Sequence, residues 1–213
     1  MKHIGRLHVL TDTVLQDRFS HLELARMALA GGADVIQYRQ KRGSTREMIE
    51  TARGLKRICE EVGAFFIVND RVDVALASEA HGVHLGQDDF PIPMARDLLG
   101  PECLIGGSAA TLEEARACVE AGADYVGFGP VYPTSSKDDA GPVSGLETLA
   151  DLVKGSPIPV VAIGGISAKN AAAVIKAGAF GVAVISSVCC QEDPRGAAHE
   201  IMHRIRQAES GAR

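Results

Sequence analysis

The stretch Ala-Gly-Gly-Ala-Asp-Val-Ile, residues 30–36, decides the fold, because it turns the end of a helical pattern directly into a β-rich strand. Variants recur at 121–126 (Ala-Gly-Ala-Asp-Tyr-Val), 177–182 (Ala-Gly-Ala-Phe-Gly-Val) and, more weakly, 78–83 (Ser-Glu-Ala-His-Gly-Val). Glycine in a left-handed conformation commonly ends a helix. Strands that alternate with helices in this way predict a parallel sheet with right-handed crossovers.

The same alternation continues along the whole chain and predicts eight strands and eight helices. The strands are expected at 7–12, 34–40, 65–70, 82–86, 104–109, 125–131, 159–165 and 181–187. The helices are expected at 20–30, 44–62, 71–78, 91–99, 111–121, 145–154, 167–177 and 194–208. Eight such units predict an α/β chain folded as a single (β/α)₈ TIM barrel over residues 1–213, with a frayed tail at 208–213. The alternative is an open doubly wound sheet, which usually has a glycine-rich loop after its first strand.

Composition places the chain among globular proteins and limits its partners. Its 213 residues suit one domain, and 22 basic against 27 acidic residues give a net charge of −5. No long basic run is present, so we expect no nucleic-acid or anionic-membrane partner. No stretch approaches the ~20 apolar residues of a membrane span. The sequence leaves a homo-oligomer possible without indicating one.

Cysteine usage and the N-terminus predict a cytoplasmic protein. The five cysteines are an odd number, and none forms a CxxC pair. A reducing compartment with free thiols is the simplest interpretation. The first residues lead directly into a strand and do not resemble a signal peptide.

The expected second strand ends in a polar cluster, Gln-Tyr-Arg-Gln-Lys at 37–41. Side chains alternate faces along a strand, so Gln37, Arg39 and Lys41 are expected to point the same way. Two cations on a buried face make little sense as packing and favour an anion-binding pocket. The plainer alternative is a solvated strand end.

The other strand ends of a TIM barrel meet at the same rim, where active sites form. Asp70 and Asp89 follow strands 3 and 4, and Arg39, Lys41 and Lys137 supply cations nearby. Hard oxygen ligands from two strand ends suit Mg²⁺ that shares the phosphates of a substrate. This pattern predicts a metal-bound diphosphate, against the alternative of a surface ion network.

A second anion site is expected at the ends of strands 7 and 8. Gly164 and Gly165 would let a ligand approach the backbone, and Ser167 would cap the following helix. Ser186 and Ser187 would add hydroxyl donors. The plainer alternative is a helix cap with close packing. Facing diphosphate and monophosphate sites indicate two substrates being joined, and no nucleophile–base pair is evident on the rim.

Six motifs in order make the chain resemble the thiamin-phosphate synthase family. They are Gln-Tyr-Arg-Gln-Lys (37–41), Asn-Asp-Arg (69–71), His-Leu-Gly-Gln-Asp-Asp (84–89), Gly-Pro-Val-Tyr-Pro-Thr-Ser-Ser-Lys (129–137), Ala-Ile-Gly-Gly-Ile (162–166) and Val-Ile-Ser-Ser (184–187). The resemblance implies that an aminopyrimidine-methyl diphosphate is coupled to a (carboxy)thiazole ethyl phosphate, giving thiamin monophosphate and pyrophosphate. The implied mechanism is dissociative, through a pyrimidine methylene cation.

The resemblance also implies roles for matching residues. Asp70 and Asp89 would hold Mg²⁺, and Arg39, Lys41, Lys137 and Ser108 would act in catalysis. The pyrimidine diphosphate would contact Gln37, Tyr38, Arg39, Gln40, Lys41, Asn69, Ser108 and Lys137. The thiazole phosphate would contact Thr134, Ser135, Ser136, Gly165, Ile185 and Ser186. Ser136 stands where the family often has threonine and keeps the hydroxyl.

Three rival interpretations remain. A thiazole tautomerase of the same fold tends, as family knowledge implies, to lose the diphosphate and metal residues that this chain keeps. His199-Glu-Ile-Met-His203 matches the HExxH pattern of zinc peptidases, but it lies in the last expected helix, where it fits a solvated outer face. A non-catalytic barrel that senses a phosphorylated ligand would leave the metal pair unexplained. His84, in expected strand 4, fits a hydrogen-bonded structural histidine.

Overall fold

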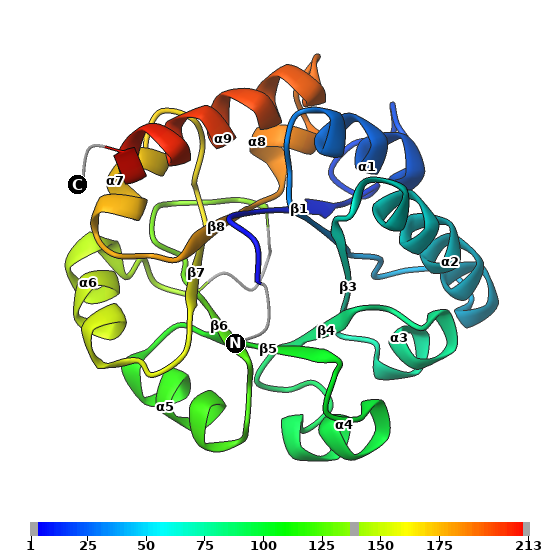
Figure 1. Cartoon of the computed structure of the whole chain (residues 1–213), viewed down its shortest axis with the longest axis horizontal. Helices are drawn as coiled ribbons and strands as arrows, with labels where there is room; N and C mark the ends of the chain where they lie inside the picture. The colour runs from blue at the N-terminus through cyan, green and yellow to red at the C-terminus, as the bar shows by residue number, and fades with distance from the viewer. Residues whose placement is uncertain (1–3, 137–140, 211–213) are drawn as a thin grey trace.

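Eight parallel strands close into a barrel in the computed structural model, which describes residues 4–136 and 141–210 (Figure 1). Neighbouring strands follow the chain order from β1 to β8, and β8 pairs with β1. The strands are β1 (Leu7–Thr11), β2 (Val35–Tyr38), β3 (Phe65–Asn69), β4 (Gly82–Leu85), β5 (Leu104–Ala109), β6 (Tyr125–Phe128), β7 (Val160–Ile163) and β8 (Gly181–Val184). The expected TIM barrel is confirmed, and the open-sheet alternative is wrong.

Helices form the outer ring around these strands (Figure 1). They are α1 (His21–Ala30), α2 (Thr45–Val62), α3 (Val72–Ser78), α4 (Ile92–Leu99), α5 (Leu112–Glu120), α6 (Gly145–Gly155), α7 (Ala171–Lys176), α8 (Ser186–Cys189) and α9 (Pro194–Ser210). The short α8 differs from the sequence prediction, which extends strand 8 through Ser187, whereas β8 ends at Val184. Helix α9 continues through Ser210 with Ala208 buried, so a frayed tail is wrong for residues 208–210. Residues 211–213 lie outside the described part of the chain.

The core has two layers that follow from the alternation of side chains along each strand. Residues such as Ile36, Val68 and Phe128 point outward and pack against the helices. Residues such as Leu10, Val35 and Ile67 point inward and fill the barrel. A residue's position along its strand therefore decides whether it belongs to the packing layer or to the barrel interior.

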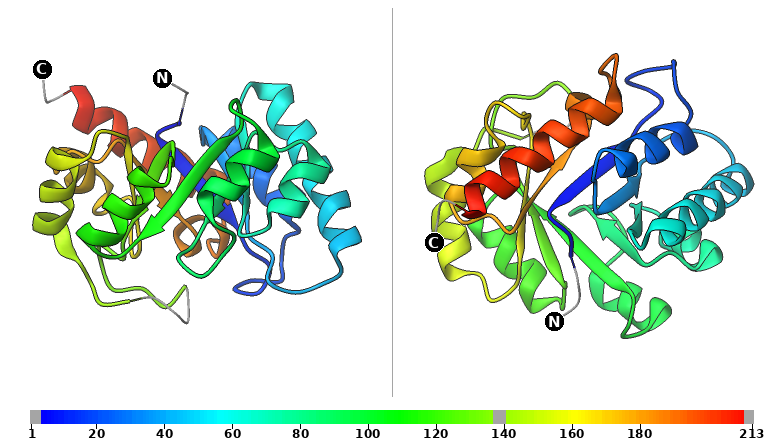
Figure 2. Two further views of the ribbon diagram at one scale, coloured as in Figure 1. Left: turned by 90° about the horizontal axis from the view of Figure 1, so that it is seen from below. Right: turned by 45° about the horizontal axis from the view of Figure 1, so that its top comes forward.

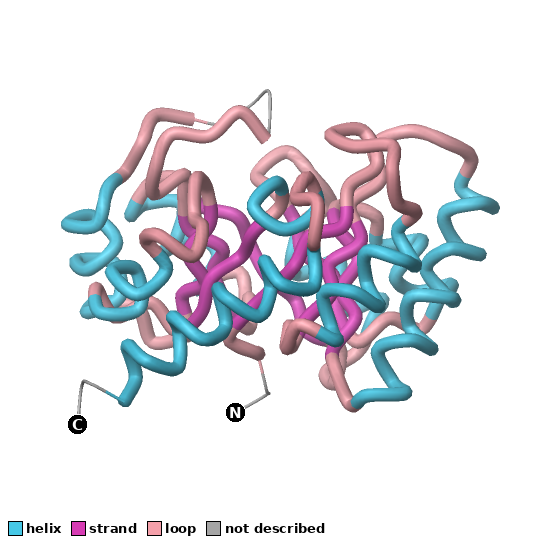
Figure 3. Tube along the Cα trace, turned by 90° about the horizontal axis from the view of Figure 1, so that it is seen from above, coloured by secondary structure: helices cyan, strands magenta, loops and turns pink. Residues whose placement is uncertain are grey.

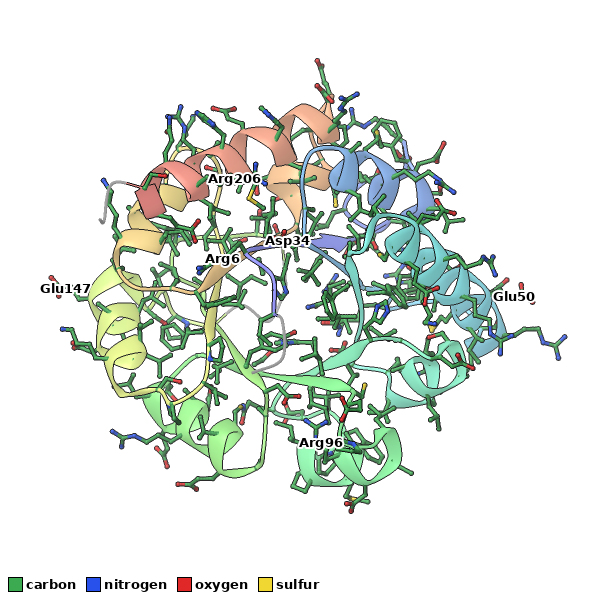
Figure 4. All side chains as sticks on the ribbon, viewed as in Figure 1. Arg6, Asp34, Glu50, Arg96, Glu147 and Arg206 are labelled. Atoms are coloured by element: carbon green, nitrogen blue, oxygen red, sulfur yellow. The ribbon has the colours of Figure 1, made fainter. Side chains whose placement is uncertain are left out.

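The Gly-Ala-Asp turns tie together the end of the barrel where the strands begin. Gly32, Gly122 and Gly178 all have positive φ, as expected for left-handed turns after helices. Asp34 then accepts hydrogen bonds from the amides of Arg6 (2.7 Å) and Leu7 (3.0 Å). Figure 4 shows Arg6 and Asp34 near the barrel centre, while Glu50 and Glu147 point outward from the helix ring. Asp34 therefore stabilises the start of β1, at the end of the barrel opposite the carboxyl ends of the strands.

The loops that follow the strands gather at one end of the barrel. Figure 2 (left) and Figure 3 show the described residues that follow β6 (129–136) and precede α6 (141–144) at this end, while the chain enters β1 and α9 finishes at the other. Among the described helices, none is long and apolar enough to cross a membrane. The fold thus brings seven strand ends and their loops around one space.

Candidate active site

A cavity of about 410 Å³ opens at the carboxyl ends of the strands. Its size falls in the range usual for small-molecule sites. Its wall is built from residues at or after the ends of β2 to β8, as is typical of TIM-barrel enzymes. Most residues that the sequence predicted for the site line this cavity: Arg39, Lys41, Asn69, Asp70, Asp89, Ser108, Thr134, Ser136, Gly165, Ile185 and Ser186.

Carboxylates and a cation meet at one side of the cavity. Lys41 Nζ lies 2.5 Å from Asp70 Oδ2, and Asp89 lies beside this pair. Asp70 has a positive φ of 66°, which is uncommon for a residue with a side chain, and its amide donates to the His84 carbonyl at 2.8 Å. This turn brings Asp70 toward the loop after β4. Burial, followed by the nearby Asp70 charge, raises the pKa of the Asp89 carboxyl.

This arrangement fits a divalent cation, because a cation would offset the burial of the Asp89 carboxylate and its repulsion from Asp70, which together raise the pKa of Asp89. Within the described residues, no group of three or more His, Cys, Asp or Glu side chains could enclose a metal. A site on Asp70 and Asp89 therefore needs further oxygen ligands from water and substrate. Mg²⁺ usually binds proteins in this way, through one or two carboxylates and substrate phosphates.

Arg39 lines the same cavity and is held by a partner that the sequence did not predict. Its guanidinium forms an ion pair with Asp12, whose side chain is only 1% exposed. Asp12 Oδ1 also accepts from the amides of Val14 (2.7 Å) and Leu15 (3.0 Å). The signal was present in the sequence, since Asp12 directly follows the first strand and must lie on the same rim.

The opposite side of the cavity presents hydroxyl groups from two distant segments. Ser136 Oγ, in the loop after β6, lies 2.9 Å from Ser186 Oγ at the start of α8. Thr134 Oγ1 accepts from the Ser136 amide at 3.2 Å. These groups and Gly165 line the same wall. A ligand with several acceptor oxygens would find hydroxyl donors converging here.

Gly165 has a structural reason to be glycine. Its φ is +62°, and a Cβ there would lie 2.5 Å from the Pro133 carbonyl oxygen. A side chain would thus displace the loop that carries Thr134 and Ser136.

The prediction that Ser167 caps the following helix is wrong. Helix α7 begins only at Ala171, and Ser167 instead forms hydrogen bonds within the preceding turn, with Asn170 and Lys169.

Ser108 lies between the two sides, and polar residues continue beneath it into the barrel. His84 Nε2 lies 2.9 Å from Ser108 Oγ, and His84 Nδ1 lies 3.0 Å from the Tyr125 hydroxyl. The expectation of a hydrogen-bonded, buried His84 is thereby confirmed. Gln37 is buried below the main cavity, in a chamber of about 20 Å³ that Ser108 also lines.

Besides Gln37, three described residues that were predicted to contact substrate do not line the main cavity. Tyr38 is the outward-facing last residue of β2 and packs edge-on against His21, so its predicted contact with substrate is wrong. The alternation that places Gln37 and Arg39 on the cavity side places Tyr38 on the opposite face, and the strand ends at Tyr38 rather than at residue 40. Gln40 bonds instead to His21 and to the Arg42 carbonyl, and Ser135 is exposed outside the lining. Lys137 lies outside the described residues.

The HExxH segment lies on α9 in the outer helix ring and does not line the cavity (Figure 1). His199 and His203 are exposed. Together with the absence of a three-residue ligand cluster among the described residues, this placement rejects the peptidase interpretation.

The comparison with known families agrees with the geometry of the cavity. Residues 7–188 match the family described as thiamine monophosphate synthase. The chain belongs to this family. It is 50% identical to the thiamine-phosphate synthase of Salinibacter ruber over 92% of this chain and 86% of that protein. It is 51% identical to the thiamine-phosphate synthase of Methanocella arvoryzae over 94% of this chain and 95% of that protein.

A solved structure gives the same result. The thiamine phosphate pyrophosphorylase from Pyrococcus furiosus is 45% identical, with a TM-score of 0.87 over 95% of this chain and 96% of that one. The function of the chain is therefore that of a thiamine-phosphate synthase, a transferase that acts on two small phosphorylated substrates. The predicted family and activity are confirmed, and the tautomerase and ligand-sensor alternatives are not supported.

Proposed function

We propose that the two sides of the cavity divide the two substrates between them. The side with Arg39, Lys41, Asp70 and Asp89 takes the diphosphate of an aminopyrimidine-methyl diphosphate. The side with Thr134, Ser136 and Ser186 takes the phosphate of a (carboxy)thiazole ethyl phosphate. The observation that carries this proposal is the separation of chemistry within one cavity, with cations and carboxylates after β2–β4 and hydroxyl groups after β6 and β8.

The pairing of charges supports the assignment of the diphosphate. Arg39 and Lys41 each contact an aspartate, so a dianionic ligand alone would meet a nearly neutral wall. A cation held by Asp70 and Asp89 would leave Lys41 free to turn to the diphosphate. The resemblance adds Lys137 from the loop after β6, and Mg²⁺ as the cation. Bound there, Mg²⁺ would neutralise charge on the departing pyrophosphate.

The chain's own residues hold and orient the reactants. Arg39 and Lys41 supply positive charge where the leaving group gains negative charge, and such groups act most strongly in the transition state. Ser108 contacts the substrate between the two sides. Ser136 and Ser186 bind the thiazole phosphate and so hold the thiazole with its nitrogen facing the pyrimidine methylene carbon. Ionisation followed by capture needs this positioning and no protein nucleophile.

A cytoplasmic location forms part of the proposal. The thiols of Cys59, Cys118, Cys189 and Cys190 are free, as expected in a reducing compartment.

Turnover with defined substrates tests the proposal. Purified protein, both phosphorylated substrates and Mg²⁺ should yield thiamin monophosphate and pyrophosphate in equal amounts, and a chelator should stop the reaction. Ser136→Ala should raise KM for the thiazole phosphate at least fivefold more than KM for the pyrimidine diphosphate. Lys41→Ala should instead raise KM for the pyrimidine diphosphate at least fivefold more than KM for the thiazole phosphate. Equal effects of both variants on both substrates would contradict the division of the cavity, and isomerised thiazole without coupling would contradict the synthase mechanism.

A further inference from the structure

Three polar residues on consecutive strands form a hydrogen-bonded row beneath the cavity. Tyr125 on β6 contacts His84 on β4, and His84 contacts Ser108 on β5. Tyr125 is 1% exposed and His84 is 8% exposed, whereas Ser108 reaches the cavity wall. The row therefore connects the barrel interior to Ser108, which is proposed to contact the substrate.

Two glycines make this row possible. Gly106 pairs in register with His84 on one side and with Tyr125 on the other, so it separates the two rings in the sheet. A Cβ at Gly106 would collide with both rings. A Cβ at Gly127, which is paired with Ser108, would lie 2.7 Å from His84 Cε1. The imidazole thus occupies space that two neighbouring strands leave open, and its ring position is fixed by packing.

The direction of the hydrogen bonds follows from the buried phenol. Within the described part of the chain, His84 Nδ1 is the hydrogen-bond partner of the Tyr125 hydroxyl. If the Tyr125 oxygen accepted a hydrogen bond from Nδ1–H, the hydroxyl hydrogen would be left without an acceptor among the described residues of the barrel interior, at a cost of ~1–3 kcal/mol. Burial also raises the pKa of Tyr125, which keeps the phenol protonated. Tyr125 therefore donates to Nδ1.

An imidazole that accepts at Nδ1 carries its proton on Nε2, because the neutral ring has one donor and one acceptor. Nε2–H then donates to Ser108 Oγ, so the serine hydroxyl hydrogen is left to point into the cavity. Diphosphate oxygens only accept hydrogen bonds. If the Ser108 hydroxyl instead donated to His84 Nε2, the lone pairs of its oxygen would face the anionic diphosphate, which is unfavourable.

We propose that Tyr125 and His84 are positioning residues that make Ser108 a hydrogen-bond donor to the diphosphate substrate. This inference rests on the proposed role of Ser108. It assigns a role in the reaction to a histidine that otherwise serves as a buried structural residue, and to a tyrosine that never touches the substrate.

A double-mutant cycle on the full-length enzyme tests the proposal. Ser108→Ala should lower kcat/KM for the diphosphate substrate by ~10², the usual cost of losing one donor to developing negative charge. His84→Leu and Tyr125→Phe should each lower it by about 10-fold in the wild type and by less than about twofold in Ser108→Ala, because both act through Ser108. His84→Gln, whose amide can still donate to Ser108, should keep more activity than His84→Leu.

The histidine tautomer gives a readout that does not depend on activity. Long-range proton–nitrogen spectra of the nitrogen-15-labelled wild-type enzyme, with His84 assigned by its loss in His84→Gln, should show the proton on Nε2. Tyr125→Phe should move part of that population to Nδ1. Two results would overturn this inference and leave the proposed role of Ser108 intact. One is a proton on His84 Nδ1 in the wild type, and the other is a loss of kcat/KM from His84→Leu or Tyr125→Phe that is as large in Ser108→Ala as in the wild type. Full activity of Ser108→Ala would overturn it together with the proposed role of Ser108.

Discussion

Asp12 and Arg39 form an ion pair that crosses from the end of β1 to the loop after β2, at the wall of the cavity. The side chains are 1% and 11% exposed, so this pair is buried. Asp12 also orders the turn after β1 through two backbone amides. Arg39 therefore reaches the cavity in an orientation that Asp12 decides.

Removing the charge of Asp12 should reduce turnover without unfolding the protein. Asp12→Asn keeps an oxygen for the amides of Val14 and Leu15 but weakens the bond to Arg39. We expect kcat to fall by about 10-fold, because a misplaced cation loses part of its effect on the leaving group. Steady-state kinetics measures this effect. Asp73→Asn, which breaks the exposed Arg71 pair away from the cavity lining, is the matched control and should behave like the wild type. Equal kinetics for both variants would contradict the role of Asp12.

The acidic pair should make the metal requirement depend on pH. The pKa of Asp89 is raised, chiefly by burial and then by Asp70, so protons compete with a cation at higher pH than they do at an ordinary aspartate. The Mg²⁺ concentration for half-maximal activity should therefore rise as pH falls through the Asp89 pKa. Asp89→Asn should lower turnover by at least ~10². Asp97→Asn, on exposed α4, should leave activity and metal dependence unchanged. Metal-independent turnover in excess chelator would reject the Mg²⁺ assignment.

The sequence predicted most of the fold because repeated local patterns determined it. Each helix–glycine–strand turn fixed one unit, and the number of units fixed the barrel. Short-range ambiguity caused the errors. The apolar run before Ser186 fits a strand that continues, so α8 was missed, and strand 2 was expected to reach residue 40 although it ends at Tyr38.

The site was predicted well where charged residues followed strands, as with Lys41, Asp70 and Asp89. Contacts between distant strands were harder to predict. Asp12 and Arg39 are 27 residues apart, and His84 and Tyr125 are 41 apart. Local sequence spacing does not indicate such a pair, because the contact can be predicted only once the register of the closed barrel is known.

The buried His8 should make the protein less stable in acid. Its pKa is lowered by burial from 6.5 to about 4, while in the unfolded chain it stays near 6.5. Between these values the unfolded state binds more protons, so stability is lost as pH falls from 6.5 toward 4. At pH ~4.5 the loss from this residue is on the order of 2–3 kcal/mol.

Urea unfolding at pH ~7 and ~4.5 measures this loss. His8→Gln can still donate to the Ile4 carbonyl but cannot titrate, so its stability should change less between the two pH values than that of the wild type. His203→Gln, on the exposed face of α9, should follow the wild type. An unchanged pH dependence in His8→Gln would show that the acid loss arises elsewhere.

The last prediction concerns how the bond to the diphosphate breaks. The described cavity lining contains carboxylates, hydroxyls and cations but no cysteine or histidine, and its chemistry suits charge stabilisation and positioning. If the pyrimidine ionises first, positive charge develops on its methylene carbon before the thiazole nitrogen attacks. A pyrimidine with an electron-withdrawing substituent should then react at least ~10²-fold more slowly in single-turnover experiments, which isolate the chemical step. Under the same conditions its binding, measured by competition against the normal substrate, should change far less. Raising the thiazole phosphate above saturation should not restore the rate, because the slow step precedes attack. A rate equal to that of the normal substrate would instead indicate direct displacement, in which Arg39 and Lys41 still assist the leaving group but no cation forms.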